Sequence, residues 1–230
     1  MLPNLSSDRI TAALAEAKDP NRHPSYQYPW PQLDLISEDK QDGFIWVLGY
    51  GSLLSKASAA RTIETSERAL RLPVIAPGAR RRFSYRIPQQ FLAERYKVTD
   101  GTQYSALDCD VTYNPDDLLN GILTRLFLKD LDAFRQREYA YDLKPIPVFE
   151  WEDIDAPHRI VYILDCPPVG STKDHPFATD IPPQTDYYKI CREGAKAVSE
   201  SFLDAFLDST YLGDGKTSVR KWEKESGILS

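Results

Sequence analysis

The sequence predicts a mixed α+β domain whose sheet is mostly antiparallel or closed, rather than doubly wound. Two observations predict this class: strand-like segments outnumber helical ones in the middle of the chain, and helical patterns lie at both ends. At 230 residues the chain is long enough for one sizeable domain or two small ones. No internal repeat or low-complexity tract interrupts it.

Composition and charge exclude several classes of protein. With 42% hydrophobic and 27% charged residues, the chain is neither disordered nor fibrous. Its net charge of −6 argues against general binding of nucleic acid or of anionic membranes. The chain shows neither a signal-peptide core nor an apolar run near the roughly 20 residues that span a bilayer. We therefore expect a soluble, cytoplasmic protein.

Cysteine and histidine usage predicts neither a disulfide framework nor a metal site. The three cysteines, Cys109, Cys166 and Cys191, are far apart and form no CxxC pair. His158 and His175 show no spacing that is typical of metal ligands. We expect reduced, mostly buried thiols and no metal.

The N-terminal residues predict a helix followed by an extended arm. Ser6 or Ser7 can cap the helix, which ends near residues 19–20. Its apolar residues recur at helical spacing: Ile10, Ala13, Leu14 and Ala17. Residues 21–41 are rich in proline and aromatic side chains, which predicts an arm that lies on the domain. We place the N-terminal helix and arm at 1–43, the main domain at 44–212 and a C-terminal extension at 213–230.

The remaining elements follow from apolar periodicity and turn signals. Strands are predicted over 44–49, 70–75, 80–87, 102–111, 118–128, 141–151 and 159–165. Helices are predicted over 56–68, 129–139, 185–208 and 217–225, and 89–97 is predicted as a short helix or an insertion.

The first predicted strand ends in a loop that could bind a ligand. Gly49 and Gly51 flank Tyr50, and a glycine lets a ligand approach the main chain closely. Ser52 follows, which can cap a helix or direct its backbone N–H toward an anion. A tight strand-to-helix turn with only a packing role explains the same residues, so both interpretations stay open.

A second candidate for chemistry is Glu138. On a helix, Leu131, Phe134 and Glu138 share one face, and the two apolar side chains should point to the core. Burial would raise the pKa of this carboxyl, which suits general acid–base catalysis near neutrality. The alternative is that Glu138 pairs with Arg135 or Arg137 at a frayed helix end.

Other catalytic patterns are weaker. Ser52 lies outside a Gly-x-Ser-x-Gly elbow, and the three histidines, His23, His158 and His175, are distant in sequence, so a serine hydrolase has no support. No Lys and Ser or Thr follow Gly51 as in a Walker loop. The run Arg80–Arg82 on an alternating strand predicts a solvated outer face with one inward arginine.

Five segments in order resemble the γ-glutamylcyclotransferase superfamily. The loop Val47-Leu48-Gly49-Tyr50-Gly51-Ser52-Leu53 resembles its Tyr-Gly-Ser-Leu loop, and Trp46 and Gly49 make it most similar to the ChaC-type branch. The other segments are Pro77-Gly78-Ala79-Arg80-Arg81-Arg82-Phe83, Leu119-Asn120-Gly121-Ile122-Leu123, residues 131–141 with Arg137-Glu138, and residues 187–195. One departure is Glu138-Tyr139-Ala140-Tyr141, which lacks the family's usual glycine.

The resemblance implies a closed or mixed β-barrel surrounded by helices, and a reaction that needs no cofactor. In that reaction the α-amine of a γ-glutamyl compound attacks its own γ-carbonyl and releases 5-oxoproline and an amine. The substrate would be glutathione, a γ-glutamyl amino acid or a γ-glutamylamine.

The resemblance also implies roles for individual residues. Glu138 would be the general acid and base, and the backbone N–H groups of Gly51, Ser52 and Leu53 would hold the oxyanion. The candidate pocket residues are Tyr50, Tyr141, Tyr162 and Tyr187, for which core packing is the alternative. A non-catalytic protein that binds a γ-glutamyl or carboxylate metabolite is the second hypothesis.

Overall fold

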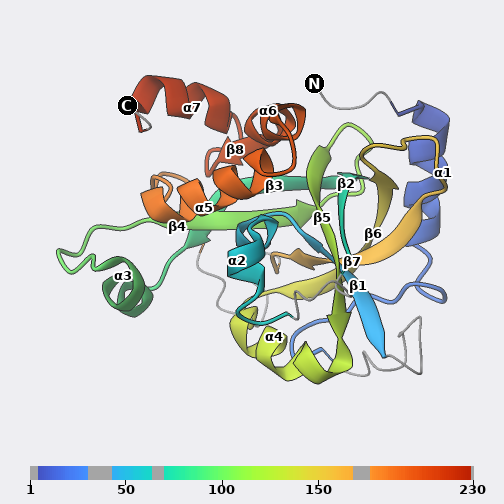
Figure 1. Ribbon diagram of the computed structural model, residues 1–230, viewed down its shortest axis with the longest axis horizontal. Helices are drawn as coiled ribbons and strands as arrows, with labels where there is room; N and C mark the ends of the chain where they lie inside the picture. Colours follow the sequence, from blue (N-terminus) through green and yellow to red (C-terminus); the bar gives the residue numbers. More distant parts are fainter. Residues whose placement is uncertain (1–4, 31–42, 64–69, 168–176, 229–230) are drawn as a thin grey trace.

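The strands form two sheets in the computed structural model, which describes residues 5–30, 43–63, 70–167 and 177–228. Five strands close into a barrel in the order β1-β5-β2-β6-β7, and three form a smaller sheet in the order β4-β3-β8 (Figure 1). Their bounds are β1 Phe44–Gly49, β2 Arg71–Pro77, β3 Ala79–Arg86, β4 Ser105–Val111, β5 Leu118–Phe127, β6 Asp142–Glu150, β7 Arg159–Asp165 and β8 Thr210–Leu212.

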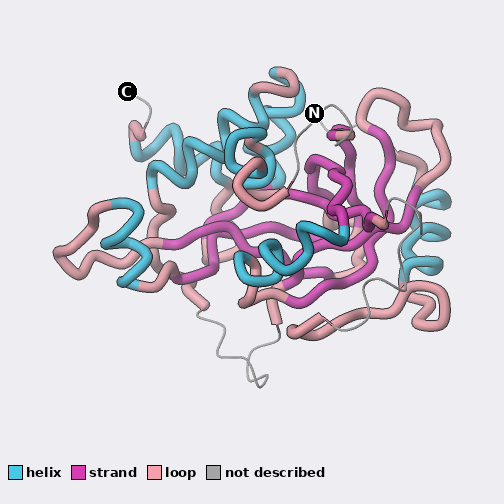
Figure 2. Tube along the Cα trace, turned by 60° about the horizontal axis from the view of Figure 1, so that its bottom comes forward, coloured by secondary structure: helices cyan, strands magenta, loops and turns pink. Residues whose placement is uncertain are grey.

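Helices cover the outside of the strands, as Figure 2 shows. The α-helices are α1 Ser7–Ala17, α2 Lys56–Ala59, α3 Gln89–Tyr96, α4 Leu131–Arg137, α5 Thr185–Lys196, α6 Glu200–Ser209 and α7 Val219–Ser226. Two 3₁₀ turns, η2 Ser52–Leu54 and η3 Leu128–Asp130, lead into α2 and α4. Helices α5, α6 and α7 gather beside the smaller sheet, and α1 lies on the far side of the barrel (Figure 1).

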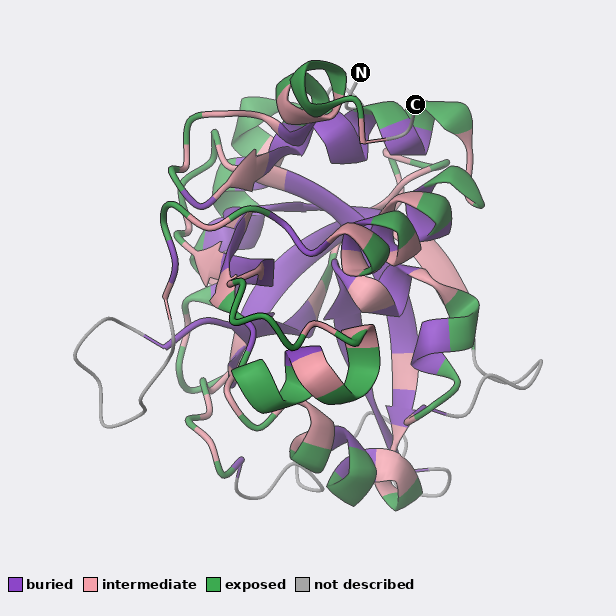
Figure 3. Cartoon of the chain, turned by 90° about the vertical axis from the view of Figure 1, so that its left-hand side faces the viewer, coloured by how far each residue is buried: buried purple, intermediate pink, exposed green. Residues whose placement is uncertain are grey.

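Strand β1 explains why the barrel closes. It pairs antiparallel with β5 from Phe44↔Phe127 to Gly49↔Ile122, and parallel with β7 at Val47↔Tyr162. All six of its residues are buried, which accounts for an apolar run without polar alternation. Figure 3 shows the same distribution, with buried strands inside and exposed outer helix faces. The predicted α+β class with a mostly antiparallel, closed sheet is confirmed.

The N-terminal helix is confirmed in detail. The Ser6 side chain accepts a hydrogen bond from the Arg9 backbone N–H, and the four predicted apolar residues of α1 are buried. The predicted arm is described as far as Trp30, whose side chain is 1% exposed and belongs to the main core. The rest of it, 31–41, lies outside the described residues. The domain boundaries stay a prediction.

Three helix predictions need correction. The helix predicted over 185–208 is two helices, because Ser199 adopts extended backbone angles and caps α6 by accepting from the Phe202 N–H at 3.1 Å. The apolar spacing continues across this break, so periodicity alone hides it. The helix predicted over 56–68 ends at Ala59, and 64–69 lies outside the described residues. Helix α4 ends at Arg137, and Glu138 follows it as the C-cap residue.

The described residues contain no disulfide, no metal-binding cluster and no membrane-spanning helix. All three cysteines are buried and none forms a disulfide. Within the described ranges, no group of three or more His, Cys, Asp or Glu side chains is arranged to hold a metal ion. No helix in those ranges is long and apolar enough to cross a membrane.

Candidate active site

The loop after β1 is a tight turn with close backbone contacts. A Cβ atom at Gly49 would lie 2.6 Å from the Cβ of Leu53, and one at Gly51 would lie 2.8 Å from the Tyr187 hydroxyl. Both distances are shorter than real Cβ contacts, so Gly49 has no room for a side chain, and a side chain at Gly51 would displace the Tyr187 hydroxyl. The turn therefore has the packing role of the alternative interpretation, and it also brings its backbone to the wall of a pocket.

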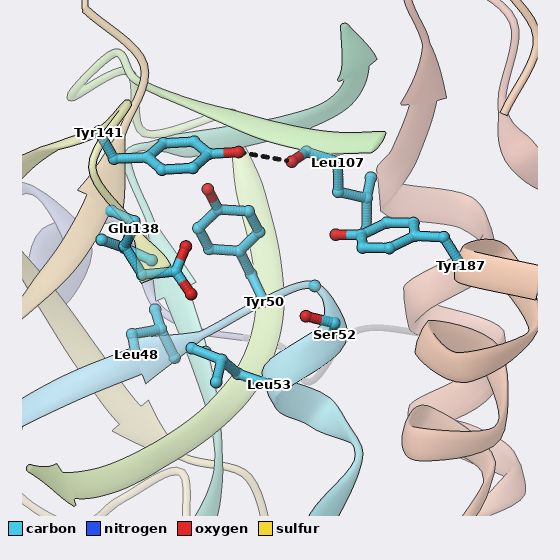
Figure 4. A pocket seen from close by; sticks show the side chains of 11 residues that line it. Leu48, Tyr50, Ser52, Leu53, Leu107, Glu138, Tyr141 and Tyr187 are labelled. Atoms are coloured by element: carbon cyan, nitrogen blue, oxygen red, sulfur yellow. Dashed lines mark hydrogen bonds between the residues drawn. The ribbon is translucent and has the colours of Figure 1, made fainter. Parts of the chain in front are cut away.

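Glu138 faces this loop from the end of α4. Leu131 and Phe134 are buried as the helical spacing predicts. Glu138 follows the helix, its backbone N–H still bonds the Phe134 carbonyl at 2.9 Å, and only 12% of its side chain is exposed. Its carboxylate points toward the ring of Tyr50 (Figure 4). The burial of Leu131 and Phe134 thus places the carboxylate of Glu138 in the pocket.

The pocket encloses about 30 Å³ and contains most of the predicted site residues. Its walls are Leu48, Gly49, Tyr50, Gly51, Ser52, Leu53, Leu107, Glu138, Tyr141, Leu164 and Tyr187. Tyr141 spans it, because its hydroxyl donates to the Leu107 carbonyl at 3.2 Å (Figure 4).

Tyr162 does not line this pocket. It lies two residues before Leu164 on β7, a spacing of about 7 Å along a strand on the same face. Its ring packs against Tyr26, with the ring centroids 5.9 Å apart. The alternative of core packing therefore describes Tyr162 better than substrate contact does.

Burial changes the pKa values of the carboxyl group and of the tyrosine hydroxyl groups in the pocket. Burial raises the pKa of Glu138, and the charge of Arg137 opposes this by stabilising the ionised form. Burial also raises the pKa of Tyr50, Tyr141 and Tyr187 well above the ordinary value of tyrosine, so all three stay neutral near pH 7. The pocket therefore offers one group that can exchange protons and three neutral hydroxyl groups, of which that of Tyr141 already donates to the Leu107 carbonyl.

Arg137 joins the two halves of the site, a role that the sequence did not reveal. Its Nε lies 2.9 Å from Glu138 Oε1, and its Nη2 donates to the Ser52 hydroxyl at 2.9 Å. Its Nη1 donates to the Ser58 carbonyl and to Thr62 Oγ1, both at 3.0 Å. The ion pair expected by the alternative interpretation of Glu138 is therefore present, but inside the pocket wall rather than at a frayed surface.

Arg81 contacts the loop after β1 through the Tyr50 carbonyl. It is the inward arginine that the alternating strand predicts, and it is fully buried. It donates to the carbonyl and side-chain oxygens of Asn120, each at 2.6 Å, to Thr210 Oγ1 at 2.6 Å and to the Tyr50 carbonyl at 3.4 Å. Because these partners are neutral, burial lowers the pKa of Arg81 to about 9.

Comparison with known proteins adds fold-level information. No protein-family model matches the chain, and no curated protein matches its sequence. Among solved structures, an uncharacterized human protein is 15% identical with a TM-score of 0.51, and the match covers 81% of this chain and 99% of that one. A γ-glutamyl cyclotransferase is 14% identical with a TM-score of 0.51, covering 81% and 98%. The chain therefore shares its fold with these two structures, one of which is a γ-glutamyl cyclotransferase.

Proposed function

We propose that this protein is a γ-glutamyl cyclotransferase that converts a γ-glutamyl amide to 5-oxoproline and a free amine. One observation carries the proposal: the largely buried carboxylate of Glu138 and the backbone of the Tyr50–Leu53 loop line the same pocket. The reaction needs a proton-transfer group beside a set of fixed hydrogen-bond donors, and this pocket supplies both.

The reaction proceeds by intramolecular attack. The Glu138 carboxylate takes a proton from the substrate's α-ammonium group, and the resulting amine forms a bond to the γ-carbonyl carbon. The bond from that carbon to the amide nitrogen then breaks as Glu138 returns the proton to the leaving nitrogen, and the ring nitrogen loses its second proton to solvent to give the lactam. The nucleophile and its target belong to one molecule, so the enzyme chiefly has to fix their orientation.

The loop backbone stabilises the oxygen that becomes negatively charged. Gly51 is the N-cap residue of η2, and Ser52 and Leu53 are its first two residues, positions at which N–H groups lack partners within the helix. In the described part of the chain, no backbone or side-chain acceptor bonds these three N–H groups. They can therefore donate to an oxyanion, the kind of interaction whose removal costs about 10²–10³ in rate.

The geometry does not favour Ser52 as a nucleophile. Its hydroxyl accepts a hydrogen bond from Arg137, which would stabilise an oxyanion but cannot remove a proton. Of the histidines in the described residues, His158 lies 2.9 Å from Glu16 Oε2 and His23 lies 3.8 Å from Glu16 Oε1. Neither lines the pocket.

A substrate panel tests the proposal. Glutathione, γ-glutamyl amino acids and γ-glutamylamines are incubated separately with the protein, and 5-oxoproline is measured by mass spectrometry. We expect product from at least one class, and turnover by Ser52→Ala within about tenfold of the wild type, since the hydroxyl is not the nucleophile. Saturable binding without product from any compound would instead support the binding protein of the second hypothesis.

Replacement of Arg137 is expected to move the pH profile. The charge of Arg137 lowers the pKa of Glu138, so Arg137→Gln should raise that pKa further. The base must be ionised, and the acid limb of kcat/KM should therefore shift to higher pH. Arg220→Gln is the control, because Arg220 pairs with Asp204 and Asp208 rather than with Glu138. An unshifted limb in Arg137→Gln would contradict this assignment.

A further inference from the structure

Residues 26–30, called the arm below, run beside the chain that follows Glu138. Tyr26 and Leu143 exchange two backbone hydrogen bonds of 2.8 Å, as in an antiparallel pair. The Tyr28 N–H donates to Asp142 Oδ1 at 2.8 Å, and the Trp30 indole N–H donates to the Tyr141 carbonyl at 3.2 Å. Every second residue of the arm therefore bonds one residue of the segment 141–143, and the last of these contacts is the nearest in sequence to Glu138.

The arm also holds the segment before Glu138. The Trp30 ring packs against Phe134 of α4, with the ring centroids 5.7 Å apart, and the Trp30 carbonyl accepts a hydrogen bond from the Arg135 guanidinium. The Trp30 side chain is almost fully buried in these contacts. A single residue therefore touches the chain on both sides of the turn that carries the candidate catalytic carboxylate.

That turn is short, and one of its side chains is exposed. Within it, the Tyr141 N–H bonds the Glu138 carbonyl at 3.1 Å, and Tyr139 is the most exposed of the large apolar or aromatic side chains in the described residues. A side chain that transfers protons must be held within about 0.5 Å of its productive position. The contacts that can do this come from Arg137, which bonds Glu138, Ser52 and Ser58, from the Tyr141 hydroxyl on the Leu107 carbonyl, and from the arm, which joins α4 to β6.

We propose that the arm is part of the active site and that Trp30 is a positioning residue for Glu138. It fixes the Glu138–Tyr141 turn between α4 and β6, so that the carboxylate and the Tyr141 hydroxyl keep their places in the pocket. The proposal rests on the proposed function for its effect on catalysis, while the effect on the turn is independent of it.

Trp30→Phe is the informative variant, because it keeps a ring against Phe134 while it removes the indole donor and part of the buried ring volume. We expect kcat for 5-oxoproline formation to fall by about tenfold or more with KM within about twofold, since misplacement of about 1 Å can cost 10²-fold. Hydrogen–deuterium exchange should rise in the peptide that covers residues 138–143. Trp30→Ala should enlarge both effects and also lower the melting temperature, because it leaves a cavity.

Arg9→Ala is the matched control. Arg9 fastens α1 by donating to the Ile154 carbonyl at 2.6 Å and to the Ala156 carbonyl at 2.7 Å, and none of these residues lines the pocket. It should loosen the N-terminal helix and leave kcat and exchange at 138–143 unchanged.

Two results would overturn the proposal: unchanged kcat and exchange in Trp30→Phe, or an equal loss of kcat in Arg9→Ala. The failure of the proposed function looks different. In that case the wild type forms no 5-oxoproline, while exchange at 138–143 still reports whether the arm holds the turn.

Discussion

Glu138→Gln should abolish most 5-oxoproline formation, with kcat/KM reduced by about 10³-fold. Glutamine has nearly the same shape and keeps the pocket filled, but it cannot accept and return a proton, a function that contributes about 10²–10⁴ in rate. The measurement is steady-state kinetics on the best substrate of the panel. Glu152→Gln is the control, since Glu152 is exposed and outside this pocket. Equal turnover in Glu138→Gln and the wild type would exclude Glu138 as the acid–base group.

The same variant separates catalysis from stability. Burial raises the folded-state pKa of Glu138 above its unfolded value, so its ionisation disfavours the folded state. The stability it contributes is fully present below the unfolded pKa and is lost as pH rises through the folded pKa. Glutamine does not ionise, and we therefore expect the melting temperature of Glu138→Gln to equal or exceed that of the wild type at pH 8. A catalytically dead variant that is as stable as the wild type rules out misfolding as the cause.

Sequence patterns predict those features of the site that lie within a single helix, strand or turn. The spacing of Leu131, Phe134 and Glu138 places one carboxylate at the end of an apolar stripe, and the structure keeps Leu131 and Phe134 buried there. Gly49 and Gly51 mark a turn whose backbone other groups approach closely, and the contacts that a Cβ would make bear this out. Periods of 2.0 and 3.6 residues suffice for such inferences, because each involves one element only.

Contacts between distant segments are beyond those patterns. Arg137 reaches Ser52 across 85 positions of sequence, and this contact exists only because the closed barrel brings η2 beside the end of α4. Strand alternation could not predict that Leu164 lines the pocket and Tyr162 does not. Both side chains lie on the same face of β7 and differ only in their position along the strand. The arm is likewise only a proline-rich and aromatic segment in the sequence. Its hydrogen bonds to residues 141–143, which show that it holds the chain after Glu138, are visible only in the structure.

Gly194→Ala should destabilise the protein and lower its activity together. Gly194 belongs to α5, and a Cβ there would lie 2.6 Å from both the Leu54 carbonyl carbon and the Ser55 backbone nitrogen. Both are main-chain atoms, so no side chain can turn aside, and either α5 or the end of η2 must move. Alanine favours a helix over glycine by about 1 kcal/mol, but overpacking typically costs 1–3 kcal/mol, and contact with backbone lies at the upper end.

We therefore expect a net loss of about 2 kcal/mol, which lowers the melting temperature by about 4–8 °C in a chain of this size. The displaced atoms directly follow Gly51–Leu53, the backbone that would hold the oxyanion, so kcat should fall even at temperatures where the variant is fully folded. Lys196→Ala, on the exposed side of the same helix, should change neither quantity. A variant at Gly194 with normal stability and normal kcat would mean that α5 does not hold the loop in place.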